Sequence, residues 1–185
     1  MNRLFLSICL LLAALFTNAQ TTTLWYGVNY GNETNNRYNN SKEWRFANFG
    51  IDYTSPINKT FDWTAGLGYN TKGGSLRANY IQAEGNVGYN FIKTDAFAMK
   101  ILTGPFIAVK VNSDYEADYA PDQEIVPSGK GGYNTFSCGW QAGLGISYKI
   151  ISLKIGYEHA FTNIESEVDR SHKTFEWFAR IGIRL

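Results

Sequence analysis

Two neighbouring residues late in the chain, Glu158 and His159, are well suited to acid–base chemistry. With a serine such as Ser137 or Ser147 they could form the catalytic group of a hydrolase, which needs a nucleophile, a histidine and a carboxylate close together. The segment around Glu158 and His159 alternates apolar and polar residues, as a β-strand does, and consecutive strand residues point to opposite faces. The two side chains therefore cannot act together, and we predict that the chain is not an enzyme.

A long acidic segment at 111–132, "VNSDYEADYAPDQEIVPSGKGG", is a second candidate for a site. Carboxylate clusters can bind Ca²⁺, but the glycine-centred twelve-residue pattern of a calcium loop is missing. The chain has two histidines and no cluster of cysteine and histidine, so neither a metal site nor a cofactor is expected. Loops that combine aromatic and charged side chains favour recognition of a partner. The predicted recognition surface consists of Asp114, Tyr115, Glu116, Asp118 and Tyr119.

The segment "FDWTAGLGYN" at 61–70 shows the pattern that dominates the chain, because every second residue from Phe61 to Tyr69 is apolar. A period of two residues indicates a β-strand with unlike faces. No segment has a convincing period of 3.6 residues, so the chain is predicted to be all-β. The strands are predicted at 22–32, 44–54, 61–71, 79–91, 96–110, 133–148, 151–161 and 174–185.

The connections between these strands alternate in length. Long segments such as "NETNNRYNNSK" and "TNIESEVDRSHK" alternate with short ones such as "IKTD" and "KI". Antiparallel strands joined in this way carry long loops at one rim and tight turns at the other, which is the layout of outer-membrane barrels. We therefore predict an eight-stranded antiparallel up-and-down β-barrel. Its first strand begins and its last strand ends at the rim that carries the tight turns.

Alternation alone does not decide which face of the barrel is the inner one. A soluble lipocalin-like barrel encloses its apolar face, whereas a transmembrane barrel turns that face to lipid. The interior of eight strands is only wide enough for side chains to fill. The aromatic faces would overfill it, while the opposite faces carry mainly Gly, Ser, Thr, Asn and Gln. We predict a transmembrane β-barrel with a narrow interior of small polar residues; a secreted soluble barrel that binds a ligand in its cavity is the alternative.

The predicted inner faces also carry isolated charges, which could line a selective pore or pair with one another and fill the interior. Buried charges need partners, and eight strands leave little further space. A filled interior is therefore expected, with a narrow porin-like pore for small solutes as the alternative. Lys154, Glu158 and Arg180 come from neighbouring strands and are expected to pair. The predicted network consists of Glu84, Lys100, Lys154, Glu158, Glu176, Arg180 and Arg184, with Asp52 and Asp62 nearer the turn rim.

The first 19 residues have the features of a secretory signal peptide. Arg3 precedes the apolar run "LFLSICLLLAALF", and "TNA" provides a small-residue cleavage site before Gln20. We expect export, cleavage of residues 1–19, and a single barrel domain at 20–185. Removal of Arg3 from the 17 basic residues makes them equal to the 16 acidic ones, so no binding to nucleic acid is expected.

Four short boxes occur in order along the chain: "YNTKGG" at 69–74, "LTGPFIAV" at 102–109, "GYEHAFTNI" at 156–164 and the terminal "ARIGIRL". Together they resemble the small outer-membrane β-barrel family often described as porin family proteins, related in build to the OmpA/OmpX-type eight-stranded barrels. The resemblance implies a monomer in the outer membrane that contacts outer-membrane lipids and lipopolysaccharide, with an extracellular partner at the long loops. The family has no shared catalytic residues to transfer, so the expected role is structural or in surface recognition.

Overall fold

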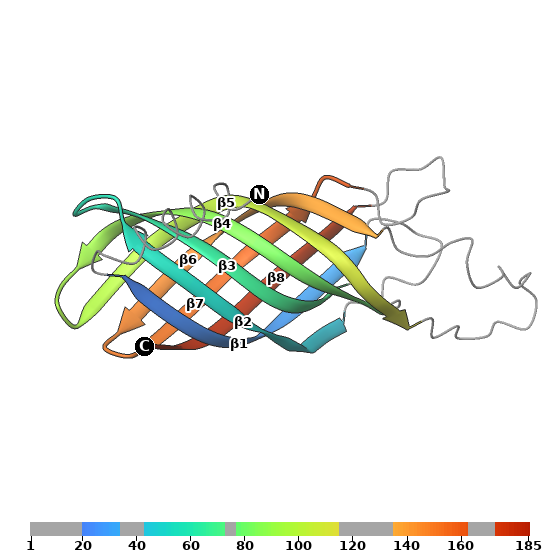
Figure 1. Ribbon diagram of the computed structural model, residues 1–185, viewed down its shortest axis with the longest axis horizontal. Helices are drawn as coiled ribbons and strands as arrows, with labels where there is room; N and C mark the ends of the chain where they lie inside the picture. Colours follow the sequence, from blue (N-terminus) through green and yellow to red (C-terminus); the bar gives the residue numbers. More distant parts are fainter. Residues whose placement is uncertain (1–19, 34–42, 73–76, 115–134, 163–172) are drawn as a thin grey trace, which may run out of the picture.

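The chain folds into a closed barrel of tilted strands (Figure 1). This computed structural model describes residues 20–33, 43–72, 77–114, 135–162 and 173–185, so the predicted signal peptide lies outside the described residues. No helix in the described part of the chain is long and apolar enough to cross a membrane. The strands are β1 (Thr21–Glu33), β2 (Glu43–Pro56), β3 (Phe61–Lys72), β4 (Arg77–Lys93), β5 (Phe97–Asp114), β6 (Phe136–Tyr148), β7 (Ile151–Ala160) and β8 (Thr174–Arg184).

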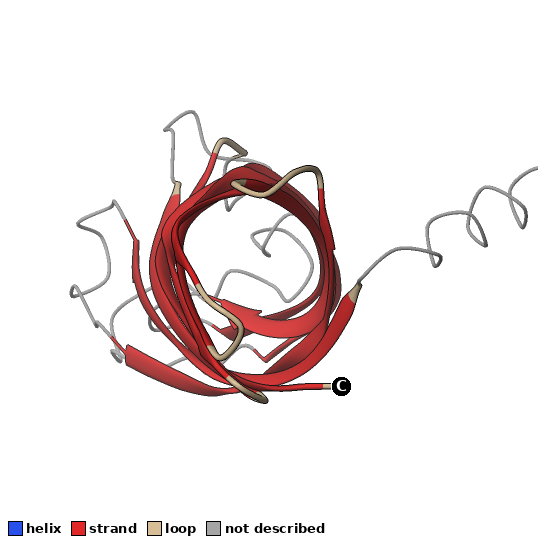
Figure 2. Ribbon diagram, turned by 90° about the vertical axis from the view of Figure 1, so that its left-hand side faces the viewer, coloured by secondary structure: helices blue, strands red, loops and turns tan. Residues whose placement is uncertain are grey.

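Each strand pairs in antiparallel fashion with the strand before it, and β8 closes the barrel by pairing with β1. Viewed along the barrel axis, the strands form a continuous ring (Figure 2). Closure gives the backbone groups of every strand partners on both sides, which strands need where no water is available. The predicted all-β class and the eight-stranded up-and-down topology are both confirmed.

The two rims of the barrel differ. Short connections at 57–60, 94–96 and 149–150 join strands at one rim, which we call the turn rim. Backbone hydrogen bonds link these connections: Lys149 N–H donates to the carbonyl of Ala96 at 2.7 Å, and Arg184 N–H donates to the carbonyl of Ile150 at 2.7 Å. The strands β1, β3, β5 and β7 end at the opposite rim, which we call the loop rim (Figure 1).

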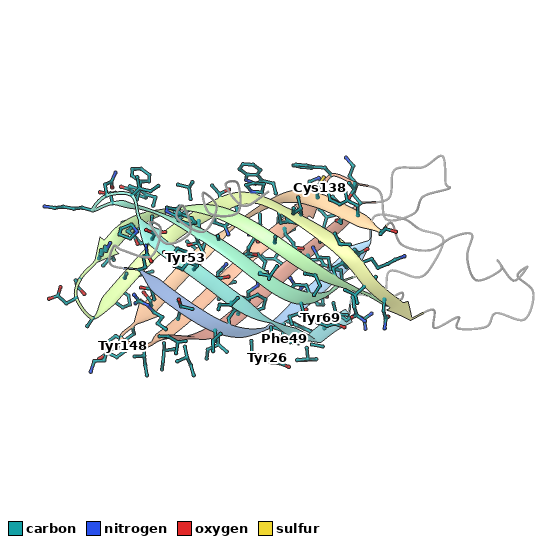
Figure 3. The ribbon with its side chains drawn as sticks, in the orientation of Figure 1. Tyr26, Phe49, Tyr53, Tyr69, Cys138 and Tyr148 are labelled. Carbon is teal, nitrogen blue, oxygen red and sulfur yellow. The ribbon has the colours of Figure 1, made fainter. Side chains whose placement is uncertain are left out.

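The outer wall of the barrel is apolar. Figure 3 shows side chains projecting outward around the wall, among them those of Tyr26, Tyr148 and Cys138. Leu24 on β1 and Leu144 on β6 are each 50% exposed, and exposed large apolar side chains occur on all eight strands. Monomeric proteins surrounded by water rarely expose an apolar surface of this extent. A soluble lipocalin-like barrel would enclose this face. The structure therefore agrees with the predicted orientation and opposes the soluble alternative.

Aromatic side chains pair on the outer wall near both rims. Near the turn rim the ring of Tyr53 contacts Trp63, with centroids 5.6 Å apart. Towards the loop rim the ring of Tyr157 contacts Trp177, with centroids 5.3 Å apart. Two such groups flanking an apolar wall correspond to the aromatic girdles of barrels that span a membrane.

A bulge in β2 changes which residues of that strand face inward. Gly27 on β1 pairs with Asn48, but Asn29 pairs with Arg45, so two residues of β2 lie opposite Val28. The extra residue shifts the alternation by one position. As a result Arg45 is buried inside the barrel, although strict alternation from the rest of β2 would turn it outward.

The interior holds large aromatic side chains as well as small polar ones, so the prediction of an interior of small polar residues is wrong in this respect. Trp25, Phe106 and Phe178 are each buried. Their rings lie where neighbouring strands carry glycine: a Cβ built at Gly50 would come within 2.5 Å of the Trp25 ring, and one at Gly156 within 2.4 Å of the Phe178 ring. The glycines on the inner faces therefore leave space inside the barrel for these aromatic rings.

Gly104 on β5 provides a test of this packing. A Cβ there would lie 1.9 Å from the backbone oxygen of Gly85 and 2.8 Å from the Cα of Asn86, and backbone atoms of a paired strand cannot move aside. We expect Gly104→Ala to lower the free energy of unfolding in lipid vesicles by about 2 kcal/mol, the usual cost of overpacking. Gly85→Ala is the matched control, because nothing lies within 4 Å of its added Cβ. Equal stabilities for the two variants in urea titrations would contradict this explanation.

Candidate functional site

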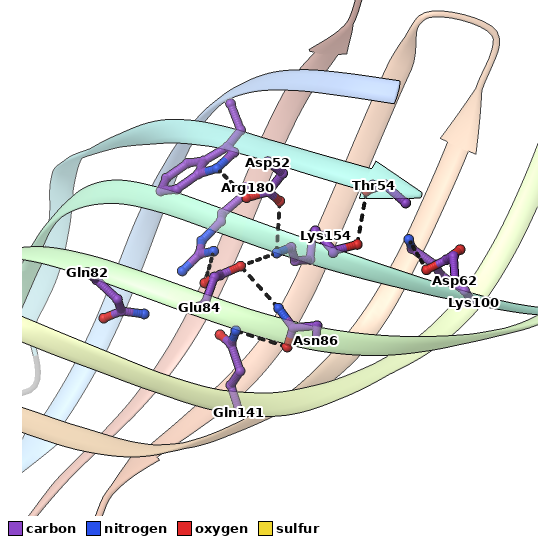
Figure 4. Close-up of polar contacts among 12 residues, drawn as sticks. Asp52, Thr54, Asp62, Gln82, Glu84, Asn86, Lys100, Gln141, Lys154 and Arg180 are labelled. Atoms are coloured by element: carbon purple, nitrogen blue, oxygen red, sulfur yellow. Dashed lines mark hydrogen bonds and ion pairs between the residues drawn. The ribbon is translucent and has the colours of Figure 1, made fainter. Parts of the chain in front are cut away.

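The centre of the barrel holds a cluster of four charged side chains from four strands (Figure 4). The carboxylate of Glu84 on β4 contacts Lys154 Nζ of β7 at 2.6 Å through Oε1 and Arg180 Nη1 of β8 at 2.8 Å through Oε2. Lys154 Nζ also lies 3.0 Å from Oδ2 of Asp52 on β2. We call these four residues the central cluster. It connects opposite walls of the barrel by ion pairs.

Neighbouring residues hold the central cluster in position. Gly66 on β3 lies between the two carboxylates, because a Cβ there would come within 2.6 Å of Asp52 Oδ1 and 2.7 Å of Glu84 Cγ. The indole N–H of Trp25 donates to Asp52 Oδ1 at 3.0 Å. The guanidinium of Arg180 lies over the Trp25 ring at 4.3 Å, and cation–π contacts of this kind are strongest where water is excluded.

Two amides extend the polar contacts from the central cluster to β6. The side-chain N–H of Asn86 donates to Glu84 Oε1 at 3.3 Å, and that of Gln141 donates to Asn86 Oδ1 at 3.0 Å. Gln141 is 1% exposed. Buried polar groups are costly without partners, and these two contacts satisfy part of the hydrogen-bonding capacity of the buried amides.

A second cluster lies on the loop-rim side of the first and contains Glu158 of β7. Glu158 accepts a hydrogen bond from Lys72 Nζ of β3 and a second from Gln82 Nε2 of β4 at 3.1 Å. The side chains of Lys72 and Glu158 are 2% and 3% exposed. The ammonium of Lys72 also lies 4.2 Å from the centroid of the Phe106 ring. We call Lys72, Gln82 and Glu158 the loop-side cluster.

The predicted pairing of Glu158 with Lys154 and Arg180 is wrong. Glu158 and Lys154 share the inner face of β7, but they are four residues apart. At about 3.3 Å per residue this separates them by about 13 Å along the strand. Lys154 therefore pairs at the level of Asp52 and Glu84, whereas Glu158 reaches the level of Lys72.

A third group of charges lies nearer the turn rim. Lys100 Nζ of β5 is 3.0 Å from Oδ1 of Asp62 on β3, and the side-chain N–H of Asn90 donates to Oδ2 of the same carboxylate at 2.8 Å. Within the described residues, the guanidinium of Arg184 donates to two neutral oxygens: the carbonyl of Lys149 at 3.3 Å and the hydroxyl of Thr21 at 3.4 Å.

On the turn-rim side of the central cluster the interior is hollow. This turn-side cavity has a volume of about 550 Å³ and is lined by residues from all eight strands. Its inner end is formed by residues of the central cluster, including Asp52, Lys154 and Arg180. The cavity is therefore a chamber that reaches from the turn rim to the ion pairs at the centre of the barrel.

The structure also separates the residues considered for hydrolysis. Glu158 is inside the barrel, whereas the ring of His159 lies on the outer wall, stacked on Phe175 with centroids 4.5 Å apart. Ser137 accepts a hydrogen bond from Thr162 at 3.3 Å. These side chains do not form a catalytic group. Within the described residues, no three His, Cys, Asp or Glu side chains are grouped so that they could hold a metal ion.

No protein-family model and no curated protein sequence matches the chain. Solved structures do match its backbone. Neisserial surface protein A (NspA) is 13% identical over 89% of this chain and 97% of its own, with a TM-score of 0.53. The N-terminal barrel domain of Pseudomonas aeruginosa OprF is 10% identical over 91% and 98%, with a TM-score of 0.49. The outer membrane enzyme PagL is 13% identical over 84% and 97%, with a TM-score of 0.47.

The chain has the fold of a small outer-membrane β-barrel. The family resemblance read from the four sequence boxes is thus confirmed at the level of fold. With identities this low, the likeness supports the outer-membrane barrel architecture alone. What the interior does must be argued from its own side chains.

Within this outer-membrane barrel, the predicted charges all come from inner faces but do not form one network. Among the described residues, Glu84 pairs with both Lys154 and Arg180. Glu176 on β8 is 1% exposed and accepts a hydrogen bond from Asn29 at 3.3 Å. The remaining members lie elsewhere: Glu158 in the loop-side cluster, and Lys100 and Arg184 at the turn-side cavity.

The predicted recognition surface lies almost entirely outside the described residues. Tyr115, Glu116, Asp118 and Tyr119 are not among them, and Asp114 is the last residue of β5. The recognition surface therefore stays a prediction.

Two interior cations were missed by the sequence analysis. Lys72 shares the inward alternation of β3, but the predicted strand ended one residue earlier, at 71. Arg45 is turned inward by the bulge in β2, for which the sequence around it gives no clear signal.

Proposed function

We propose that the chain is exported to the outer membrane and acts there as a non-conducting barrel with a structural or surface-recognition role. The apolar outer wall supports contact with membrane lipids, including lipopolysaccharide. The long connections at the loop rim are the proposed site for an extracellular partner, with Asp114, Tyr115, Glu116, Asp118 and Tyr119 as the candidate surface. That the chain is not an enzyme stays part of the proposal.

One observation carries the non-conducting role: two buried clusters of paired charges lie one above the other in the interior. Glu84 forms ion pairs with Lys154 and Arg180 at the centre of the barrel, and Lys72 pairs with Glu158 on the loop-rim side. An ion that crossed the barrel would have to disrupt both clusters. Water-filled channels belong to barrels of about 16 strands, twice the number here.

The alternative is a narrow porin-like pore for small solutes. The turn-side cavity favours it, because a volume of about 550 Å³ already leads from the turn rim to the central cluster. A pore would then require the central and loop-side clusters to rearrange.

Recordings in planar lipid bilayers separate the two functions. The purified wild-type barrel is expected to give no steady current beyond rare, small events, because both clusters keep their charges paired. A solvent-only insertion control and a known large porin in the same bilayers calibrate the measurement. Stable, ion-selective openings of the wild-type protein would reverse the ranking and favour the pore. Recovery of the native protein in a soluble fraction instead of the outer membrane would contradict both.

A further inference from the structure

The turn-side cavity has the size of a ligand site. Its volume of about 550 Å³ falls within the range of about 300 to 1,000 Å³ typical of small-molecule pockets. The wall of the barrel separates it from the surrounding lipid, and its inner end is closed by the central cluster. A ligand would therefore be a solute that enters from the turn rim.

Two of the three carboxylates in the cavity wall, those of Asp52 and Asp62, already have a partner on each oxygen; the third belongs to Asp95. Asp62 is contacted by Lys100 at Oδ1 and by Asn90 at Oδ2. Asp52 accepts a hydrogen bond from the Trp25 indole at Oδ1 and pairs with Lys154 at Oδ2. The charges of Asp62 and Asp52 are thus already balanced by Lys100 and Lys154, which makes these two carboxylates less available to a cationic ligand.

The cations in the wall, by contrast, have donors to spare. Lys100 has three N–H groups, one ion-pair partner and a side chain that is 22% exposed. In the part of the chain that the structure describes, Arg184 donates to neutral oxygens and no carboxylate lies within ion-pair distance of it. Cations also outnumber carboxylates among the lining residues, which include Lys93, Lys100, Lys154, Arg180 and Arg184 against Asp52, Asp62 and Asp95.

We propose that the turn-side cavity binds a small anion of the phosphate or carboxylate class, with Arg184 as the main donor and Lys100 as a second. A guanidinium without a carboxylate partner suits the planar, bidentate recognition of such groups. Hydroxyl groups in the same wall, from Thr54, Ser147 and Ser152 among others, can hydrogen-bond to the remaining oxygens.

Titration with sodium phosphate tests the proposal. The isotope-labelled protein in neutral detergent micelles is titrated at an ionic strength kept constant with sodium chloride, and backbone amide signals are followed by NMR. We expect saturable shifts at cavity residues such as Ser147 and Ser152. Arg184→Gln should weaken binding about tenfold, the effect of losing a hydrogen bond to a charged group, whereas Arg184→Lys should retain more of it.

Two further variants keep the test decisive. Lys100→Gln should weaken binding less than Arg184→Gln, because Asn90 still holds the Asp62 carboxylate. Lys59→Gln is the matched control, since Lys59 is exposed in the β2–β3 turn and does not line the cavity. Shifts that grow linearly without saturation, or that Arg184→Gln leaves unchanged, would overturn the proposal. Because binding is measured without any current, its failure would leave the non-conducting role untouched.

Discussion

Replacing Glu84 with alanine is expected to lower the free energy of unfolding by about 4 kcal/mol, as removal of one partner from a buried ion pair commonly does. Glu84 is the only residue in the described structure that pairs with both Lys154 and Arg180. Lys154 would keep its contact with Asp52 at 3.0 Å. The guanidinium of Arg180, 2% exposed between the Trp25 and Phe178 rings, would lose the carboxylate with which it pairs.

Urea titration of the protein folded in lipid vesicles measures this loss. Asp62→Ala is the matched control, because it also breaks a lysine–carboxylate pair, but Lys100 is 22% exposed and can be hydrated. We expect Asp62→Ala to cost about 1 kcal/mol or less, in the range of exposed pairs. Equal losses of unfolding free energy for Glu84→Ala and Asp62→Ala would show that burial does not determine how much the central cluster contributes to stability.

The alternation of residue types was enough to predict the barrel and the inward direction of most of its charges. Residues such as Glu84, Lys154 and Arg180 lie in the middle of regular strands, where the period of two is uninterrupted. The aromatic residues on the outer faces and the alternating connection lengths then fixed the orientation and the two rims. These features are local, and local patterns can be read from one sequence.

The pairing of the charges could not be read in this way. Which inner residues meet across a barrel depends on strand tilt and stagger, and these are set by all eight strands together. Glu84 and Lys154 are 70 residues apart in the chain and on strands that are not neighbours. The predicted pairing of Lys154, Glu158 and Arg180 rested on their origin in neighbouring strands and took no account of the separation between Lys154 and Glu158 along β7.

The interior aromatic residues show a second limit. Phe106 follows the inward alternation of β5, but the volume argument assigned large rings to the outer wall. The interior accepts this ring because a paired strand carries Gly139, where a Cβ would come within 2.7 Å of it. Such compensation depends on the register between strands, which the sequence alone does not reveal.

The contact between Lys72 and Glu158 leads to the second large effect. Lys72→Met keeps the length of the side chain and its contact with the Phe106 ring but removes the charge. Glu158→Leu removes the carboxylate and keeps most of the volume. Each single variant is expected to cost about 3 kcal/mol, because the charge that remains is almost completely buried and unpaired.

The double variant Lys72→Met/Glu158→Leu is expected to be more stable than either single variant, since it leaves neither charge unpaired and replaces a buried pair by apolar groups of similar size. Among the described residues, Gln82 is the one that loses an acceptor, the Glu158 Oε2 atom at 3.1 Å. Because the double variant should lose less than the roughly 3 kcal/mol of either single variant, a double-mutant cycle from urea titrations should give a coupling free energy above about 3 kcal/mol, beyond the usual upper end for residues in contact.

A control cycle distinguishes the observed partner from the one inferred from the sequence. Lys154→Met combined with Glu158→Leu should be additive within about 0.5 kcal/mol, as expected for sites that share no contact. The two residues are four positions apart on β7, and Lys154 pairs with Asp52 and Glu84 instead. Strong coupling in this control together with additivity between positions 72 and 158 would mean that the charges pair along β7. The interior would then contain one cluster instead of two, and the argument for two barriers to ion flow would fail.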